Sequence, residues 1–373
     1  MQEVNEQFII SELKNHENEI FMAITPWHAK SMEASYLRYR TSSTGSPLVI
    51  CMCLDSENPI INESNFTTLS NGSSFYKYHI KRFNSIKNLF DLFFTTLKFI
   101  FSRKHSKGTD SSNDVYLYTT RDIPFYFVMR VYNSIKNCNI TNYICDEGIA
   151  SSYDAYNLKQ EPFIKRKLSR IVSKRITIVR DEFLNIDDNG VHANYDLRNR
   201  YLNVFKTIKV DFSPFNVPKE KYALLCYAPI DEETEMVDKN QFEDIIHMIV
   251  DINNQHGRKT VIKMHPREKN IQFYKELGCI VWNGKYSLEE IMANIDNKPS
   301  FVIGGTSTGL VTSNILFGIN SISTILLYEK CNKEGFAPSD LDKYIGDVNQ
   351  FADIYKEYVK FPKSSEELIN YLK

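Results

Sequence analysis

Short apolar runs alternate with longer amphipathic stretches along most of this chain. Runs rich in Ile, Val, Leu, Tyr and Cys indicate buried strands, and apolar residues recurring every three or four positions indicate helices. The predicted strands are 20–24, 48–53, 115–118, 142–145, 176–179, 223–227, 260–264, 279–282, 301–304 and 321–327. The predicted helices are 31–40, 86–101, 125–136, 239–255, 287–294, 309–317 and 364–373. This alternation is typical of parallel α/β sheets.

The alternation is interrupted near the middle of the chain, at residues 207–220. Pro214 and Pro218 break regular structure there, because proline lacks the backbone N–H and restricts the residue before it. We therefore predict an α/β fold with two Rossmann-like domains, 1–206 and 221–373, which face a central cleft and are joined by 207–220. A single large sheet is the alternative. The last helix could pack back on the first domain.

Composition narrows the class of protein. The 373 residues are 42% hydrophobic and 24% charged, which is globular, and a net charge of −1 predicts no nucleic-acid partner. The first 20 residues contain acids and no apolar secretory segment, and the seven cysteines form no CxxC pair. These features predict a cytoplasmic protein with reduced core cysteines. The cysteines in or beside strand-like runs are Cys51, Cys53, Cys145, Cys226 and Cys279.

Two stretches depart from the neutral average, residues 81–107 and residues 163–180, and the second has seven basic residues and no acid. Residues 81–107 carry seven Lys or Arg and a single acid, interleaved with Leu, Phe and Ile. The apolar run is too short and too interrupted to span a bilayer. It fits a core helix with solvated ends, or a helix that lies on an anionic membrane such as the inner face of the plasma membrane.

Polar groups follow two predicted strands of the first domain, at the edge where open α/β sheets bind ligands. Trp27 lies in Thr25-Pro26-Trp27-His28, and Asp146-Glu147-Gly148 follows a later strand. Acid-glycine pairs are also ordinary turn chemistry, and Trp27 is equally explained as a structural residue. For each motif, a role in binding a ligand and a purely structural role both stay open at this point.

In the second domain, Lys263-Met264-His265-Pro266-Arg267 follows a predicted strand. The proline ends the strand and holds His265 at its tip, where the flanking cations suit an anionic ligand that His265 can protonate. The alternative is a loop histidine that is hydrogen-bonded to the backbone.

Residues 304–309, Gly-Gly-Thr-Ser-Thr-Gly, leave the next strand and open a helix. The backbone N–H groups of a helix N-terminus, with the hydroxyls of Thr306, Ser307 and Thr308, form an anion cradle. The loop has neither a Walker lysine nor the glycine spacing of a dinucleotide site. A helix cap beside a glycine turn is the simpler alternative.

Two acidic motifs are less specific. Asp231, in Pro229-Ile230-Asp231-Glu232-Glu233, either caps the next helix or acts as a general base. Asp340-x-Asp342 has the spacing of a metal-binding pair but falls in a polar, helical segment. We therefore expect no metal site.

Taken in order, these motifs resemble the bacterial sialyltransferases of glycosyltransferase family 52, the lipooligosaccharide sialyltransferases, which are related to the bacterial polysialyltransferases. The matching segments are Asp146-Glu147-Gly148, 224–231, His265-Pro266-Arg267, 283–289 and Thr306-Ser307-Thr308. The resemblance implies a GT-B fold and an inverting transfer of sialic acid from CMP-sialic acid. The acceptor implied is a galactose-terminated glycan or glycolipid of the bacterial surface, such as lipooligosaccharide or capsule. Neither a metal nor a cofactor is implied.

The resemblance also assigns roles on the donor side. His265 is the general acid, Ser307 and Thr308 hold the phosphate or the sialic acid carboxylate, and Glu289 holds the ribose hydroxyls. The other residues expected beside the donor are Lys263, Pro266, Gly305 and Thr306.

The resemblance assigns the general base and the acceptor-binding residues less directly. Family 52 places the base on the residue that corresponds to Asp231, although Ile230 is an insertion here. Polysialyltransferases instead use the motif that corresponds to Asp146 and Glu147. We therefore expect Asp231 to be the base, with Asp146 as the second candidate. Trp27, Glu147 and Gly148 are expected near the acceptor.

Three alternatives remain. The chain could be a polysialyltransferase, another GT-B transferase with a different activated donor, or a non-catalytic protein that binds nucleotides or carbohydrates. An oligomer and a membrane contact through residues 81–107 are compatible with each.

Overall fold

The structure is a computed structural model, which describes residues 1–3, 8, 19–39, 47–54, 61–69, 73–80, 94, 114–120, 139–146, 177–187, 190–228, 237–265, 267–283, 286–328 and 338–373. The chain divides into two compact units. Unit 1 comprises Met1–Ile186 and His192–Val204, and unit 2 comprises Asp187–Val191 and Phe205–Lys373.

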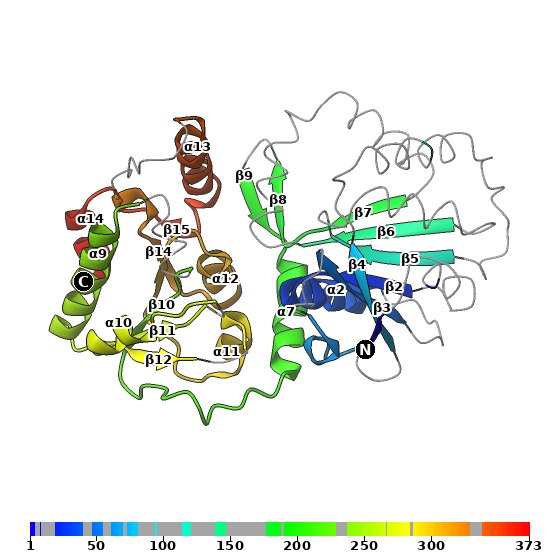
Figure 1. Cartoon of the computed structure of the whole chain (residues 1–373), viewed down its shortest axis with the longest axis horizontal. Helices are drawn as coiled ribbons and strands as arrows, with labels where there is room; N and C mark the ends of the chain where they lie inside the picture. Colours follow the sequence, from blue (N-terminus) through cyan, green and yellow to red (C-terminus); the bar gives the residue numbers. More distant parts are fainter. Residues whose placement is uncertain are drawn as a thin grey trace. The chain divides into compact units, whose positions relative to one another are not determined.

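Unit 1 is built on a sheet of seven parallel strands in the order β1-β4-β3-β2-β5-β6-β7, coloured blue to green in Figure 1. The strands are β1 (Gln2–Glu3), β2 (Glu19–Ala23), β3 (Leu48–Leu54), β4 (Ser74–Ile80), β5 (Asp114–Thr119), β6 (Asn139–Cys145) and β7 (Thr177–Asp181). Helix α2 (Pro26–Tyr39) packs against β2, β5 and β6. Four further elements precede β10 in the chain: η1 (Glu63–Asn65), the paired strands β8 (Leu184–Asp187) and β9 (Gly190–Ala193), and α7 (Tyr195–Thr207). The boundary between the two units passes through β8, β9 and α7.

Aromatic rings fill much of the unit 1 core. The rings of Phe21 and Tyr118 stack with centroids 4.4 Å apart, and Tyr118 stacks in turn on Tyr143 at 5.0 Å. Tyr36, from α2, meets both Phe21 and Tyr118 edge-on. Such pairs add to the stabilisation from burial, so they fix α2 against the centre of the sheet.

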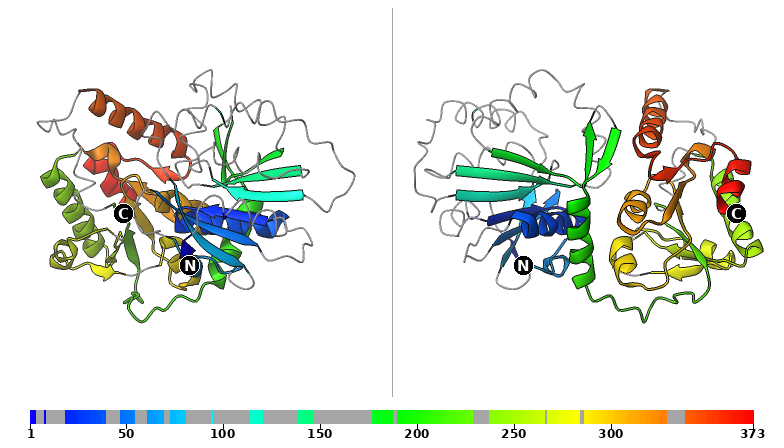
Figure 2. Two further views of the ribbon diagram at one scale, coloured as in Figure 1. Left: turned by 45° about the vertical axis from the view of Figure 1, so that its right-hand side comes forward. Right: turned by 180° about the vertical axis from the view of Figure 1, so that it is seen from behind.

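Unit 2 holds a second parallel sheet, of six strands in the order β12-β11-β10-β13-β14-β15. The strands are β10 (Tyr222–Leu225), β11 (Lys259–Lys263), β12 (Ile280–Trp282), β13 (Phe301–Gly304), β14 (Asn320–Ser323) and β15 (Val359–Lys360). The helices are α9 (Lys239–Gln255), α10 (Ile271–Glu276), α11 (Leu288–Asn294), α12 (Thr308–Phe317), η4 (Ile325–Leu327), α13 (Pro338–Tyr355) and α14 (Ser365–Leu372). Figure 2 shows α9 and α14 on one face of this sheet and α11 and α12 on the other.

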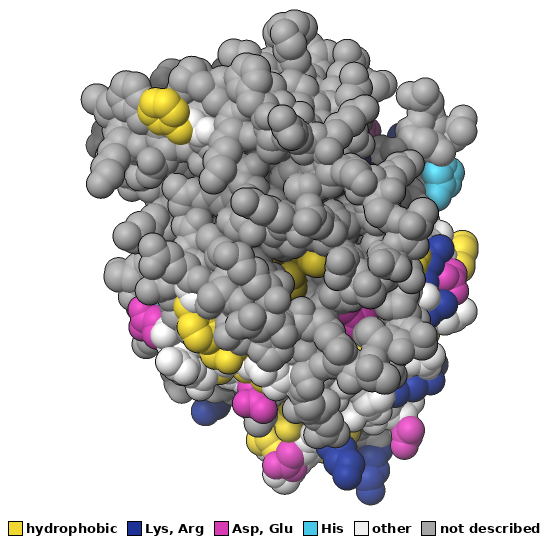
Figure 3. All heavy atoms as spheres, turned by 90° about the vertical axis from the view of Figure 1, so that its right-hand side faces the viewer, with side chains coloured by type: hydrophobic (Ala, Val, Ile, Leu, Met, Phe, Trp, Pro, Cys, Tyr) yellow, Lys and Arg dark blue, Asp and Glu magenta, His cyan; other side chains and the backbone are white. Residues whose placement is uncertain are grey.

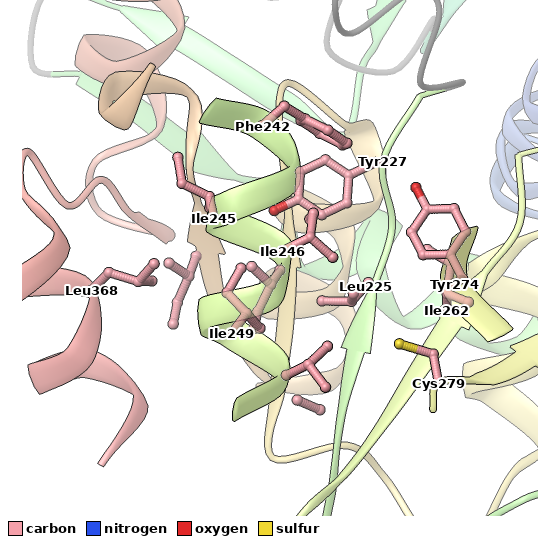
Figure 4. Packing of buried hydrophobic residues seen from close by; sticks show 14 of the residues in the cluster. Leu225, Tyr227, Phe242, Ile245, Ile246, Ile249, Ile262, Tyr274, Cys279 and Leu368 are labelled. Carbon is pink, nitrogen blue, oxygen red and sulfur yellow. The ribbon is translucent and has the colours of Figure 1, made fainter. Parts of the chain in front are cut away.

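Helix α9 shows how the sequence pattern produces this packing. Asp238 caps it by accepting a hydrogen bond from the N–H of Gln241 at 2.9 Å. Phe242, Ile245 and Ile249, spaced at three and four residues, lie on its buried face and pack against alternate residues of the strands (Figure 4). The buried cysteines Cys51, Cys145, Cys226 and Cys279 are free thiols, as predicted.

The predicted α/β class and its two Rossmann-like, GT-B-type halves are confirmed, because both sheets are parallel. Helix 239–255 and strand 301–304 have the predicted bounds. The strand predicted at 321–327 was wrong in its second half: β14 ends at Ser323 and η4 follows. Residues 208–221 contain neither helix nor strand. The helices predicted at 86–101 and 125–136 lie outside the described residues, apart from Phe94.

Candidate functional site

The strand order of unit 2 creates a position for a ligand. The chain passes from β10 to β11 and β12 on one side of the sheet, and then returns to β13 on the other side of β10. All the strands are parallel, so the segments after β10, β11 and β13 leave the same edge. Open α/β sheets bind their ligands outside this edge, where the strand order reverses.

The loop after β13 is a preformed helix N-terminus. Ser307 is the N-cap of α12, and its hydroxyl accepts a hydrogen bond from the N–H of Gly309 at 3.2 Å. Thr306 is exposed, and Ser307 and Thr308 are half-buried. The three predicted hydroxyls therefore lie together at an N-terminus that favours an anion.

Two hydroxyl residues of the neighbouring strand hold this loop from behind. Ser323 Oγ donates to the carbonyl of Gly305 at 2.7 Å, and the N–H of Thr324 donates to the carbonyl of Gly304 at 2.9 Å. A trans peptide places its N–H opposite its C=O, and the described residues include no cis peptide. The N–H groups of Gly305 and Thr306 therefore point away from Ser323 and Thr324.

Two glycines are required by close approaches at this edge. A Cβ on Gly304 would lie 2.4 Å from the carbonyl oxygen of Cys226, which follows β10. A Cβ on Gly309 would lie 2.8 Å from Cδ2 of Leu288, at the start of α11. The absence of both side chains lets α12 begin directly beside β10 and α11.

The contact between α11 and α12 brings together three polar side chains. Glu289, 6% exposed, accepts a hydrogen bond at 2.6 Å from the hydroxyl of Thr312. Burial raises the pKa of Glu289, and the hydrogen bond from Thr312 opposes that shift. Burial also lowers the pKa of Lys263, and the carboxylate of Glu289 opposes this. The Lys263 ammonium donates to the carbonyl of Met264 at 2.9 Å.

His265 follows β11, beside β10 in the sheet, and is half-buried. Its Nδ1 accepts a hydrogen bond from the N–H of Arg267 at 3.2 Å. In the neutral ring the proton therefore resides on Nε2, which is the atom that can donate. Pro266 lies outside the described residues.

Unit 1 has a polar edge of its own. Its strand order reverses between β2 and β5, and Trp27 follows β2 at the start of α2. Trp27 Nε1 donates to Oδ1 of Asp146 at 3.1 Å, and the indole ring stacks on Tyr201 with centroids 5.2 Å apart. Two residues singled out separately in the sequence therefore meet here.

Asp146 is held from several sides. It is 2% exposed, and its Oδ2 accepts a hydrogen bond from the N–H of Phe183 at 2.8 Å. Its own N–H donates to the hydroxyl of Ser31 at 2.6 Å. The carboxylate is therefore fixed in orientation at the C-terminal end of β6. Asp231, Glu147 and Gly148 lie outside the described residues.

The family model of the alpha-2,8-polysialyltransferases (POLYST) matches residues 19–326, which is most of the chain. The chain belongs to this family. The predicted relationship to bacterial sialyltransferases is thereby confirmed, and the chain is a glycosyltransferase of the sialyltransferase class. The matching family is the polysialyltransferase group, which the sequence motifs resemble alongside family 52.

Three solved structures of sialyltransferases are similar to this polysialyltransferase family member. The alpha/beta-galactoside alpha-2,3-sialyltransferase of Photobacterium phosphoreum is 13% identical, with a TM-score of 0.48, over 92% of this chain and 98% of that chain. The sialyltransferase of Photobacterium damsela is 10% identical, with a TM-score of 0.47, over 92% and 81%. The 2,6-sialyltransferase of Photobacterium sp. JT-ISH-224, in a ternary complex with CMP and lactose, is 13% identical, with a TM-score of 0.43, over 92% and 78%. No curated protein matches the sequence.

The sequence analysis did not identify three hydroxyl residues that lie beside the loop 304–308 and Glu289. Thr312 lies in an apolar helix, and Ser323 and Thr324 lie at the end of a strand, where hydroxyls are easily read as core or turn residues. The signal that could have found them is a polar side chain inside an otherwise apolar run.

The remaining sequence features concern a metal site, a membrane span and charged segments. Among the described residues, no three His, Cys, Asp or Glu side chains could share a metal ion, and no helix is long and apolar enough to cross a membrane. Asp340-x-Asp342 lies in helix α13, as predicted.

The basic stretch 81–107 lies outside the described residues except for Phe94, which is 63% exposed. The described side chains on the face in Figure 3 mix both signs of charge.

Proposed function

We propose that this member of the family transfers sialic acid from CMP-sialic acid to the end of a glycan, with inversion at the anomeric carbon. The observation that carries the proposal is the arrangement around β10. The anion-binding loop 304–308 leaves β13 on one side, and His265 leaves β11 on the other. This arrangement suits a substrate whose leaving group is a nucleotide phosphate.

Departure of CMP builds negative charge on its phosphate. The N–H groups of Gly305 and Thr306, which point away from Ser323 and Thr324, and the hydroxyls of Ser307 and Thr308 supply hydrogen bonds to that charge. His265, whose Nδ1 accepts the N–H of Arg267, offers its Nε2–H as a hydrogen bond to the phosphate oxygen that leaves. Protonation of that oxygen would require the ring in its doubly protonated form, with Nδ1 released from Arg267. Lys263, at the end of β11, adds a positive charge near Glu289.

An incoming hydroxyl needs a base on the opposite face of the sugar. We propose Asp146 for this role, because membership of the polysialyltransferase family favours the acid-acid-glycine motif. Its carboxylate is oriented by the hydrogen bonds that it accepts from Trp27 Nε1 and from the N–H of Phe183. Asp231 is the second candidate, by its resemblance to family 52.

The acceptor follows from the family as well. The alpha-2,8-polysialyltransferase family favours a glycan that already ends in sialic acid, which the enzyme would lengthen. A galactose-terminated acceptor, the expectation from family 52, is the second candidate. We propose that neither a metal nor a cofactor takes part, because the N–H groups, hydroxyls and cations named above meet the phosphate charge.

The test is release of CMP from CMP-sialic acid by the purified protein, followed with oligosialic acid, with lactose and without acceptor, in the presence of EDTA. We expect transfer to oligosialic acid. The His265→Ala variant should lose about 10²–10⁴-fold in turnover and still bind CMP. A protein that ignores CMP-sialic acid but uses another nucleotide sugar would overturn the proposal.

A further inference from the structure

Thr312 directs its single hydroxyl proton to Glu289. The Thr312 Oγ1 to Glu289 Oε1 distance is 2.6 Å, whereas the carbonyl oxygens of Thr308 and Gly309 lie 3.1 Å and 3.4 Å from the same hydroxyl. A separation of 2.5–2.7 Å is typical of a hydroxyl that donates to a charged carboxylate. The hydrogen bond to Glu289 is therefore the favoured one of the three.

The surroundings leave this pair little freedom. Thr312 is 2% exposed and Glu289 is 6% exposed. A threonine inside a helix has few rotamers, and the backbone carbonyls beside Oγ1 restrict it further. Glu289 lies in the first turn of α11, which the close approach of Leu288 to Gly309 sets against α12.

We propose that Thr312 is a positioning residue that holds the Glu289 carboxylate in the orientation that accepts hydrogen bonds from the ribose hydroxyls of the donor nucleotide. The proposal deepens the proposed function and rests on its donor site. A carboxylate has about four acceptor positions; Thr312 occupies one, and Ser287 and the N–H of Glu289 itself also act on the carboxylate. Discrimination follows because a nucleotide that lacks a hydroxyl leaves one acceptor position of a buried carboxylate unfilled.

Two substitutions at this position separate positioning from packing. Thr312→Val keeps the shape of the side chain and removes the hydroxyl, and Thr312→Ser keeps the hydroxyl. Ser313→Ala is the matched control, because among the described residues the buried hydroxyl of Ser313 has no hydrogen-bond partner. Thermal melting of each variant reports on folding.

The measurement is the affinity of each protein for CMP and for 2′-deoxy-CMP, by calorimetric titration. We expect wild type, Thr312→Ser and Ser313→Ala to prefer CMP by at least tenfold. Thr312→Val should bind CMP about tenfold more weakly and 2′-deoxy-CMP with unchanged affinity, so that the preference is largely lost. A folded Thr312→Val that keeps the full preference would overturn the proposal.

The same titrations distinguish this proposal from the proposed function. A wild type that binds CMP and 2′-deoxy-CMP equally would overturn the role of Thr312 and leave the donor assignment standing. A wild type that binds UMP and not CMP would overturn the donor assignment, and the ratio of UMP to 2′-deoxy-UMP would then decide the role of Thr312. If no ribonucleotide in the panel binds, both proposals fail.

Discussion

The indole Nε1 of Trp27 donates a 3.1 Å hydrogen bond to Oδ1 of Asp146, a residue 119 positions away. One face of the indole is covered by Tyr201, and Asp146 receives a second hydrogen bond from Phe183. Trp27 is therefore placed to orient a carboxylate. The sequence analysis expected Trp27 near the acceptor and did not include this contact.

The Trp27→Phe variant removes the N–H and retains an aromatic ring. A hydrogen bond to a charged group contributes about 1.5–3 kcal/mol, so we expect kcat to fall about tenfold or more with little change in the acceptor KM. Steady-state kinetics with varied acceptor measures both constants. A raised acceptor KM at normal kcat would instead indicate a stacking surface.

Comparison of Asp146→Asn with Asp231→Asn identifies the base. General bases contribute about 10²–10⁴-fold to rate, so Asp146→Asn should lose transfer to that extent while CMP binding persists. Asp231→Asn should retain most of the activity. The reverse result would move the base to Asp231, in the manner of family 52.

Ser323→Ala tests whether the anion-binding loop is held from behind. The carbonyl of Gly305 loses a buried hydrogen bond, which costs about 1–3 kcal/mol. We expect the donor KM to rise about five- to tenfold because the loop loosens. Ser321→Ala, on the same strand, is the control: its hydroxyl lies 3.4 Å from the carbonyl of Ile319 and does not touch the loop. Equal effects of the two substitutions would contradict the loop's dependence on Ser323.

The lowered pKa of His28 predicts how the free energy of unfolding depends on pH. Burial lowers its pKa from 6.5 to about 4, and its Nδ1 lies 3.4 Å from the N–H of Ile24. Below pH 6.5 the unfolded chain takes up the proton first, so stability is lost as the pH falls from about 6.5 to 4, by about 3 kcal/mol in total.

The measurement for His28 is urea unfolding between pH 4 and pH 7. His28→Asn, which offers an acceptor near the position of Nδ1 and does not titrate there, should show a flatter dependence than wild type. Parallel curves for the two proteins would mean that other groups cause the loss.

The basic stretch 81–107 leads to a separate proposal, a peripheral contact with the inner face of the plasma membrane. Each Lys or Arg near an anionic surface contributes about 1 kcal/mol, and salt screens that attraction. We expect cosedimentation with phosphatidylserine vesicles at low salt that weakens as salt is added. Binding to neutral vesicles to the same extent would contradict an electrostatic contact.

Elements with a strong local pattern were predictable from the sequence. Helix α9 carries apolar residues at helical spacing behind a capping aspartate, and β13 is a buried apolar run between turn residues. The strand predicted to continue to Leu327 ends at Ser323, because the N–H of Thr324 pairs with the carbonyl of Gly304 and the chain turns. That contact joins residues 20 positions apart and has no local signal.

The candidate site was predictable where a motif carried its own chemistry. The loop 304–308 and His265 lie at strand ends, as expected, because parallel strands place all such ends at one edge. The partners of these residues were not predictable. Thr312 meets Glu289 only because Gly309 lets two helices approach closely, which depends on packing between elements distant in sequence.

The hydrogen bonds that hold Gly304 and Gly305 have a consequence for the speed and strength of binding. Ordering a free backbone residue opposes association by about 1–2 kcal/mol, and glycine is the most mobile of all residues. In this loop, folding of β14 has already imposed that order. The phosphate of the proposed donor would therefore meet a loop that is already ordered, and we expect its association to be limited by diffusion and charge rather than by rearrangement of the loop.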